Sequence, residues 1–150
     1  MNTKQDIRDF LGQKTLAIVG LSRDPQAFSA RVAVELEQKG YRLLPVNPNA
    51  DRIGDRQCYP SVSALPRGVG GALLVTPPAQ TAAVVREAVA AGIRRIWIQQ
   101  GAESEEAIAC CRSDGIAAVS RQCILMHAEP VASFHAVHRW FAKLFGMMPR

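Results

Sequence analysis

One polar loop directly after an apolar run is the first place where this sequence could bind a charged ligand. The apolar run is Thr15–Val19, and the loop that follows it reads Gly20-Leu21-Ser22-Arg23-Asp24-Pro25. A loop between a buried strand and a helix can turn backbone N–H groups and the positive helix end toward a phosphate. Arg23 and the nearby Arg31 carry planar guanidinium groups that pair well with phosphate oxygens. The spacing therefore predicts an anion site.

The loop does not fit the common phosphate-binding motifs. A dinucleotide fold usually shows G-x-G-x-x-G here, with an acid near the end of the next strand. This chain keeps Gly20 but has Ser22 and Pro25 at the other two glycine positions, and Asn47 and Pro48 follow the second strand in place of an acid. No G-K-[ST] phosphate loop occurs either. The pattern gives only weak support to a nicotinamide cofactor.

The residue types for covalent or metal chemistry are scattered. Cys58, Cys110, Cys111 and Cys123 show no C-x-x-C spacing, and a cytosolic chain keeps its thiols reduced, so we expect free thiols. Adjacent cysteines on a helix point about 100° apart, which makes a poor metal pair. His127 is the one histidine near the predicted crevice, and a lone histidine is more often structural. We assign no catalytic and no metal-binding residue.

The elements that position the loop alternate regularly along the chain. Glycines and turn formers separate apolar runs, typical of buried strands, from segments with a helical apolar stripe. The expected helices are 4–11, 29–39, 79–91 and 104–113, with one helical turn at 61–65. The expected strands are 15–19, 41–46, 71–75, 95–99 and 116–120.

Strands separated by helices pair in parallel through right-handed crossovers. The sequence therefore predicts an α/β, Rossmann-like, doubly wound sheet of five parallel strands, and we expect the order 3-2-1-4-5. Ligands bind such sheets beyond the carboxyl ends of the strands where the order reverses, here between strands one and three or above strand one. The loops to consider are 20–25, 47–49, 76–78, 99–101 and 120–123.

Length and composition favour one globular domain. The chain has 150 residues, is 48% hydrophobic, and carries 18 basic against 13 acidic residues, a net charge of +5. A domain of this length buries enough surface to fold without disulfides or metals. The charge excess is too small for nucleic acid, and neither a membrane span nor a secretory signal is found. The expected location is the cytoplasm.

The C-terminal segment has its own pattern. From residue 131 to about 148, apolar residues recur at helical spacing, which predicts an added C-terminal helix beside a core of about 13–130. We expect this seam to pack on the sheet, and the alternative is a homodimer contact. The seam consists of Phe134, Val137, Phe141, Leu144 and Met148.

Five segments resemble those of small stand-alone CoA-binding proteins, whose fold is similar to the CoA-binding domain of succinyl-CoA synthetase alpha subunits. Each segment is short, but all five come in the right order at the right strand ends. They are Ile18-Val19-Gly20-Leu21-Ser22 followed by Arg31-Val32, Val46-Asn47-Pro48-Asn49, Cys58-Tyr59-Pro60-Ser61, Trp97-Ile98-Gln99-Gln100-Gly101 and Arg121-Gln122-Cys123-Ile124.

The resemblance implies a small-molecule ligand, CoA or acyl-CoA, and a set of binding residues. The phosphate end would be lined by Gly20, Ser22, Arg23 and Pro25, with Arg31 near it. The adenosine end would be lined by Asn47 and Pro48, and one wall by Thr76 and Pro77. The pantetheine path would be lined by Gln99, Gln100 and Gly101. The loop after strand two has no lysine where the synthetase-type domains tend to carry one, so the 3′-phosphate lacks an obvious contact. The synthetases also use a second domain with a phosphorylated histidine, which has no counterpart here.

The leading hypothesis is therefore a CoA- or acyl-CoA-binding protein without catalytic machinery of its own, acting as a sensor, carrier or subunit. The alternative is a small dinucleotide-dependent oxidoreductase or transferase. A third hypothesis is an interaction protein with a vestigial crevice. Cys123 follows the last strand and could form a mixed disulfide with a bound CoA thiol, although a buried, inert thiol is the commoner state.

Overall fold

The computed structural model describes residues 1–128. The predicted C-terminal helix, its apolar seam and the homodimer contact assigned to it lie outside the described residues.

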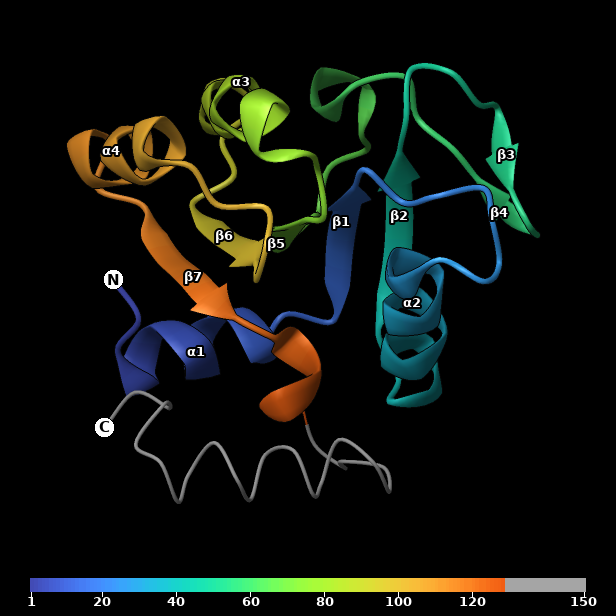
Figure 1. Cartoon of the computed structure of the whole chain (residues 1–150), viewed down its shortest axis with the longest axis horizontal. Helices are drawn as coiled ribbons and strands as arrows, with labels where there is room; N and C mark the ends of the chain where they lie inside the picture. The colour runs from blue at the N-terminus through green and yellow to red at the C-terminus, as the bar shows by residue number, and fades with distance from the viewer. Residues whose placement is uncertain (129–150) are drawn as a thin grey trace.

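A five-stranded, all-parallel sheet forms the centre of the molecule (Figure 1), as predicted. Its strands follow one another in the spatial order β2-β1-β5-β6-β7. Most of their residues are buried, which explains the continuous apolar runs in the sequence. The strands are β1 (Thr15–Val19), β2 (Arg42–Val46), β5 (Gly71–Leu74), β6 (Arg95–Gln99) and β7 (Ala117–Gln122).

The expected strand order, 3-2-1-4-5, is wrong: the five strands run 2-1-3-4-5. The cause is the segment after β2, which turns back along the outer edge of that strand. Tyr59 N–H donates to Pro45 O at 2.9 Å, and Asn47 N–H donates to Tyr59 O at 2.9 Å. Because this edge of β2 is occupied, the third strand of the sheet, β5, pairs with the free edge of β1 instead.

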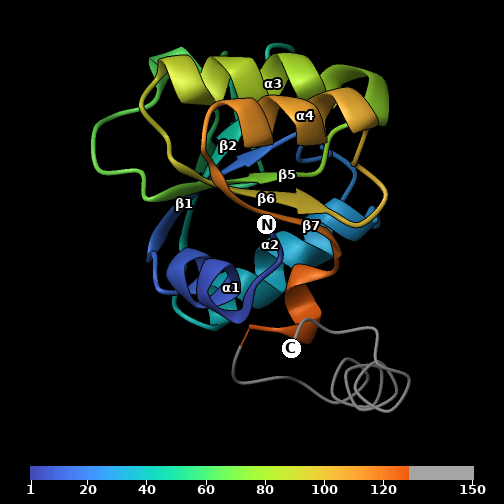
Figure 2. The same ribbon diagram turned by 90° about the vertical axis from the view of Figure 1, so that its left-hand side faces the viewer.

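Helices cover both faces of the sheet (Figure 2). The helices α1 (Lys4–Leu11) and α2 (Phe28–Gln38) pack on one face, and α3 (Pro78–Ala90) and α4 (Glu105–Ser113) pack on the other. Successive strand residues point to opposite faces, so in β1 Leu16 and Ile18 face α1 and α2, while Ala17 and Val19 face α3 and α4. No helix within residues 1–128 is long and apolar enough to cross a membrane.

Short elements complete the connections. The predicted helical turn at 61–65 is present as the 3-10 helix η1 (Val62–Ala64), and a second 3-10 helix, η2 (Ile124–Met126), follows β7. The sequence did not predict the hairpin of β3 (Arg52–Ile53) and β4 (Arg56–Gln57), which lies between β2 and η1.

Both lateral edges of the sheet are partly occupied. At the β2 edge the occupying residue is Tyr59, as described above. At the β7 edge it is Asn2, whose N–H donates to Ala118 O at 3.1 Å and whose Oδ1 accepts from Ser120 N–H at 2.7 Å. Asn2 has a φ of 61°, a conformation that asparagine tolerates better than most residues.

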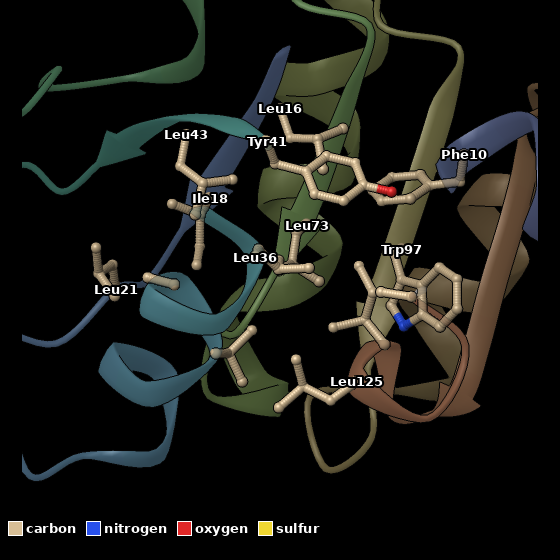
Figure 3. Close-up of a cluster of buried hydrophobic side chains, with 14 of the residues drawn as sticks. Phe10, Leu16, Ile18, Leu21, Leu36, Tyr41, Leu43, Leu73, Trp97 and Leu125 are labelled. Carbon is tan, nitrogen blue, oxygen red and sulfur yellow. The ribbon is translucent and has the colours of Figure 1, made fainter. Parts of the chain in front are cut away.

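Trp97 is the largest fully buried side chain of the core beneath α1 and α2 (Figure 3). Its ring centroid lies 5.5 Å from that of Phe10, and its indole Nε1–H donates to Gln122 O at 3.0 Å. Tyr41 O–H donates to Leu11 O at 2.6 Å, which ties the end of α1 to the same core. The first helix is therefore part of the packed domain.

We predict that Phe10→Ala lowers the free energy of unfolding by about 3–5 kcal/mol, because it leaves a cavity beside Trp97. Phe28→Ala is the matched control: this ring is 48% exposed, whereas Phe10 is 1% exposed. The control should change stability by less than about 0.5 kcal/mol. Urea denaturation followed by circular dichroism measures both. Equal effects would contradict the placement of α1 in the core.

Candidate functional site

The carboxyl ends of β1 and β5 are the point where the two halves of the sheet diverge. These strands are neighbours, yet the chain leaves β1 for α2 on one face and leaves β5 for α3 on the other. In open α/β sheets, ligands usually bind above such a divergence, and we refer to the region above these strand ends as the crevice. The predicted place, between strands one and three, is thus the divergence point in the observed topology.

Gly20 forms the floor of this crevice. Its φ is +94°, and a Cβ placed on it would lie 3.0 Å from the carbonyl carbon and oxygen of Val75 and 3.1 Å from the Cα of Thr76. The flanking backbone is held by two hydrogen bonds, from Gly20 N–H to Val46 O at 3.3 Å and from Val75 N–H to Val19 O at 2.9 Å. The loops after β1, β2 and β5 therefore meet at a residue that must lack a side chain.

Hydrogen bonds within the loop after β1 fix its shape. Ser22 N–H donates to Ser29 Oγ at 3.0 Å, and Ser22 Oγ accepts from Asp24 N–H at 3.1 Å. Asp24 Oδ1 accepts in turn from Gln26 N–H at 2.9 Å. The Ser22 hydroxyl thus closes a local turn, and the N-cap of α2 is Ala27.

The cations of this region are available to a ligand. Arg23 and Pro25 are exposed on the loop, and Arg31 is exposed on α2. Within residues 1–128, neither Arg23 nor Arg31 forms an ion pair. Two guanidinium groups without carboxylate partners therefore lie close to the crevice.

The helices beside the crevice begin differently from the other two. The N-caps of α2 and α3, Ala27 and Pro77, make no side-chain cap hydrogen bond, and neither helix has an acid in its first turn. By contrast, α4 begins with a capping Ser104 followed by two glutamates, and α1 has a complete capping box. An uncapped helix start keeps its positive end for an anion. This contrast makes the crevice the part of the described structure best suited to phosphate.

The loops after β5 and β6 are joined by buried hydroxyl groups. Thr81 Oγ1 donates to Ala102 O at 2.6 Å, and the Thr76 hydroxyl lies 2.7 Å from Thr81 Oγ1. Thr76 is 5% exposed and Thr81 is fully buried. The predicted wall residue Thr76 therefore contributes its backbone to the crevice, while its side chain holds the two loops together. The sequence did not predict this role of Thr81, because nothing in the sequence pattern distinguishes it from any other helical threonine.

The predicted pantetheine path is divided between two environments. Gln99 is 3% exposed, and its Oε1 accepts from Ile124 N–H at 3.1 Å, so its side chain fixes the start of η2. Gln100 and Gly101 are exposed, and Gly101 has a φ of +95°. The carboxyl end of β2 has a tight turn as well, because Asn47 Oδ1 accepts from Asn49 N–H at 2.9 Å beside the exposed Pro48.

All four cysteines are free thiols. Burial raises the pKa of Cys111 to about 11 and also raises that of Cys58, so both remain protonated near neutral pH. Cys123 is 7% exposed and belongs to the core beneath α2, so attack on a disulfide there needs local opening. Within residues 1–128, no three His, Cys, Asp or Glu side chains are grouped closely enough to hold a metal ion.

A cavity of about 690 Å³ lies at the opposite end of the sheet, between η1 and the carboxyl end of α3. Within its lining, Glu87 Oε1 accepts from Ser63 N–H at 3.3 Å. It is also far from the divergence of β1 and β5 along both strands. We therefore place the candidate site in the crevice and not in this cavity.

Comparison with known proteins identifies relatives of this chain. A family model described as a CoA binding domain matches residues 14–129. An ADP-forming acetate–CoA ligase II from Archaeoglobus fulgidus is 34% identical over 106 residues, covering 69% of this chain and only 16% of the ligase. The uncharacterised protein YneT from Bacillus subtilis is 27% identical over 123 residues, covering 81% of this chain and 91% of that protein.

A solved structure agrees with these matches. A conserved hypothetical protein from Pyrococcus furiosus superposes with a TM-score of 0.71 and 39% sequence identity, covering 74% of this chain and 96% of that one. All five crevice loops fall within the residues matched by the family model.

We predict that Gly20→Ala destabilises the protein more than Gly40→Ala. The two glycines have φ values of +94° and +97°, but a Cβ at Gly40 meets no atom within 4 Å. Both variants carry the strain of a positive φ, about 1–2 kcal/mol. Only Gly20→Ala adds a steric clash with Val75, which lowers the free energy of unfolding by about a further 1–3 kcal/mol. Equal denaturation midpoints would contradict the close approach of the two loops.

Proposed function

This chain belongs to the family of CoA-binding domains, and we propose that it binds coenzyme A, free or as a thioester, in the crevice at the carboxyl edge of its sheet. The observation that carries the proposal is the divergence of β1 and β5, where α2 and α3 begin without a capping side chain or an acid. CoA is a polyanion with a diphosphate and a 3′-phosphate. Such a ligand suits two positive helix ends and two guanidinium groups that form no ion pair within residues 1–128.

The diphosphate would lie against the loop after β1. Gly20 lets this loop lie directly against the backbone of Val75 and Thr76, and Ser22 and Pro25 belong to the turn beside it. Arg23 would neutralise the charge by hydrogen bonds to phosphate oxygens, and Arg31 lies near it on α2. The uncapped start of α2 adds its partial positive charge at the same place.

The remaining predicted residues would border the rest of the ligand. The resemblance assigns Asn47 and Pro48 to the adenosine end, and Pro77 with the backbone of Thr76 would form a wall. The pantetheine arm would pass over Gln100 and Gly101, which are exposed, while Gln99 supports the loop from below. In this arrangement backbone and loop shape carry more of the binding than buried side chains do.

The proposed role is binding without bond formation. The ligase activity named for the archaeal relative belongs to an enzyme of which this chain matches 16%. A binding role as a sensor, carrier or subunit requires only the crevice. The alternative, a dinucleotide-dependent enzyme, has Asn47 where an acid would hold the ribose hydroxyls.

We predict that CoA stabilises this protein and that NAD does not. A ligand at 100 times its dissociation constant adds roughly 2.7 kcal/mol to the free energy of unfolding, and each kcal/mol moves the melting midpoint of such a domain by about 2–4 °C. Saturating CoA should therefore raise the midpoint by about 5–10 °C in differential scanning fluorimetry. A larger shift with NAD or NADP would support the enzyme, and no shift with any of them would support an interaction protein.

We further predict that Arg23→Ala weakens CoA binding about 10- to 100-fold, because a hydrogen bond between charged groups contributes about 1.5–3 kcal/mol. Arg42→Ala is the control. Arg42 is also exposed, but it is the first residue of β2 and so lies at the amino end of the strand, away from the carboxyl ends. The net charge changes equally in both variants, so a general electrostatic effect would weaken binding equally in titration calorimetry. That result would contradict a local contact at Arg23.

A further inference from the structure

Phe28 is an exposed aromatic residue on the first turn of α2. Two large apolar side chains of this helix are exposed, Phe28 at 48% and Val34 at 47%. The helix runs away from the loop after β1, so Phe28 lies at the crevice end and Val34 nearly two turns further on. Single exposed apolar residues are common, so exposure alone does not indicate a binding role for this ring. Its orientation and its neighbours carry more information.

The ion pair of Glu37 establishes which way Phe28 points. Arg56, on β4, donates from Nε to Glu37 Oε1 at 2.7 Å, so this flank of α2 faces the β3–β4 hairpin beyond the outer edge of β2. Nine residues at about 100° each separate Phe28 from Glu37, which puts the two on opposite flanks. The buried residues Val32, Ala33 and Leu36 lie between them. Phe28 therefore points away from the hairpin, toward the side of the sheet that carries β5, β6 and β7.

Arg31 is the neighbour of Phe28 on the solvent side of the helix. It lies three residues after Phe28, and residues at this spacing are neighbours on a helix surface, with Cβ atoms about 5–6 Å apart. Helical side chains lean toward the N-terminus, so both side chains lean toward the crevice loops. The nearest acids are Asp24, whose Oδ1 accepts from Gln26 N–H, and Glu35, which lies one turn further from the crevice and is half-buried. An aromatic face and a guanidinium without an ion pair in the described structure thus stand side by side.

We propose that Phe28 and Arg31 hold the 3′-phosphoadenosine end of CoA, with the adenine stacked on the Phe28 ring and the 3′-phosphate bound by Arg31. The proposal rests on the proposed function and replaces the adenosine position beside Asn47 and Pro48, because the loop after β2 has no cation to hold the 3′-phosphate. Adenine is the aromatic part of the ligand, and the 3′-phosphate is attached to the adjoining ribose. The pantetheine arm offers no ring and no anion to this pair.

The pair also gives a physical basis for choosing CoA over NAD. Base stacking on an aromatic side chain tolerates any adenine nucleotide, so Phe28 alone does not discriminate. The guanidinium adds a charge-assisted bond only for a ligand with a phosphate on its ribose. CoA carries that group, whereas NAD and dephospho-CoA lack it.

The test compares CoA, dephospho-CoA and 4′-phosphopantetheine by titration calorimetry on the full chain. Phe28→Ala should weaken CoA and dephospho-CoA by the same factor, about 5- to 100-fold, and leave 4′-phosphopantetheine unchanged, because that ligand has no base. Arg31→Gln should weaken CoA alone, to about the affinity of dephospho-CoA. Val34→Ala, an equally exposed position on another flank of α2, should bind all three ligands like the wild type.

The outcomes separate the two proposals. If the wild type binds CoA and Phe28→Ala binds it equally well, the adenosine lies elsewhere, as at Asn47 and Pro48, and only the present inference fails. If Phe28→Ala weakens 4′-phosphopantetheine as much as CoA, the ring serves another part of the ligand, and the inference fails again. If the wild type binds neither CoA nor 4′-phosphopantetheine, the proposed function itself is wrong. Circular dichroism of each variant checks that the fold is retained.

Discussion

The close approach of Gly20 to Val75 and Thr76 is the constraint on which the rest of the structure depends. It exists because β1 and β5 are adjacent parallel strands whose chains leave their carboxyl ends in different directions. A side chain at Gly20 would push the two loops apart exactly where α2 and α3 must diverge. The crevice, the orientation of both helix starts and the position of the loop arginines all follow from this contact.

Side chains around the crevice divide into two groups. Thr76, Thr81 and Gln99 are buried, and their side chains form hydrogen bonds within the protein. Arg23, Arg31 and Gln100 are exposed; they lie on the loop after β1, on α2 and on the loop after β6. Rigid loops supported from below lower the entropic cost of holding a ligand, because fewer groups must be ordered on binding. In the proposed complex the buried group would therefore contribute to affinity without touching the ligand.

The sequence was sufficient to predict most elements of the fold. Continuous apolar runs and glycine stops predicted all five sheet strands and four helices within a residue or two, because strands covered on both faces leave a strong local signal. The order of the strands was not predictable in the same way. It depends on Tyr59 occupying the edge of β2, a contact between segments more than ten residues apart that leaves no periodic trace.

The divergence of neighbouring strands was predictable from the sequence, but the environment of each side chain near it was not. The topological rule located the loops, but it did not distinguish Gln99, whose side chain is buried, from Gln100 beside it. It also overlooked Phe28, since exposure depends on how the helix is rotated over the sheet. That rotation follows from the contacts of Val32 and Leu36 with the core and from the ion pair between Glu37 and Arg56.

Asn2 and Tyr59 have a consequence for how copies of this protein can associate. Unpaired strand edges invite another chain to add a strand and extend the sheet. Here each outer strand already gives part of its backbone hydrogen-bonding capacity to a single residue of the same chain. Joining two sheets edge to edge would first require one of these residues to be displaced. Self-association of the described domain is therefore steered away from a continuous intermolecular sheet and toward its helical faces.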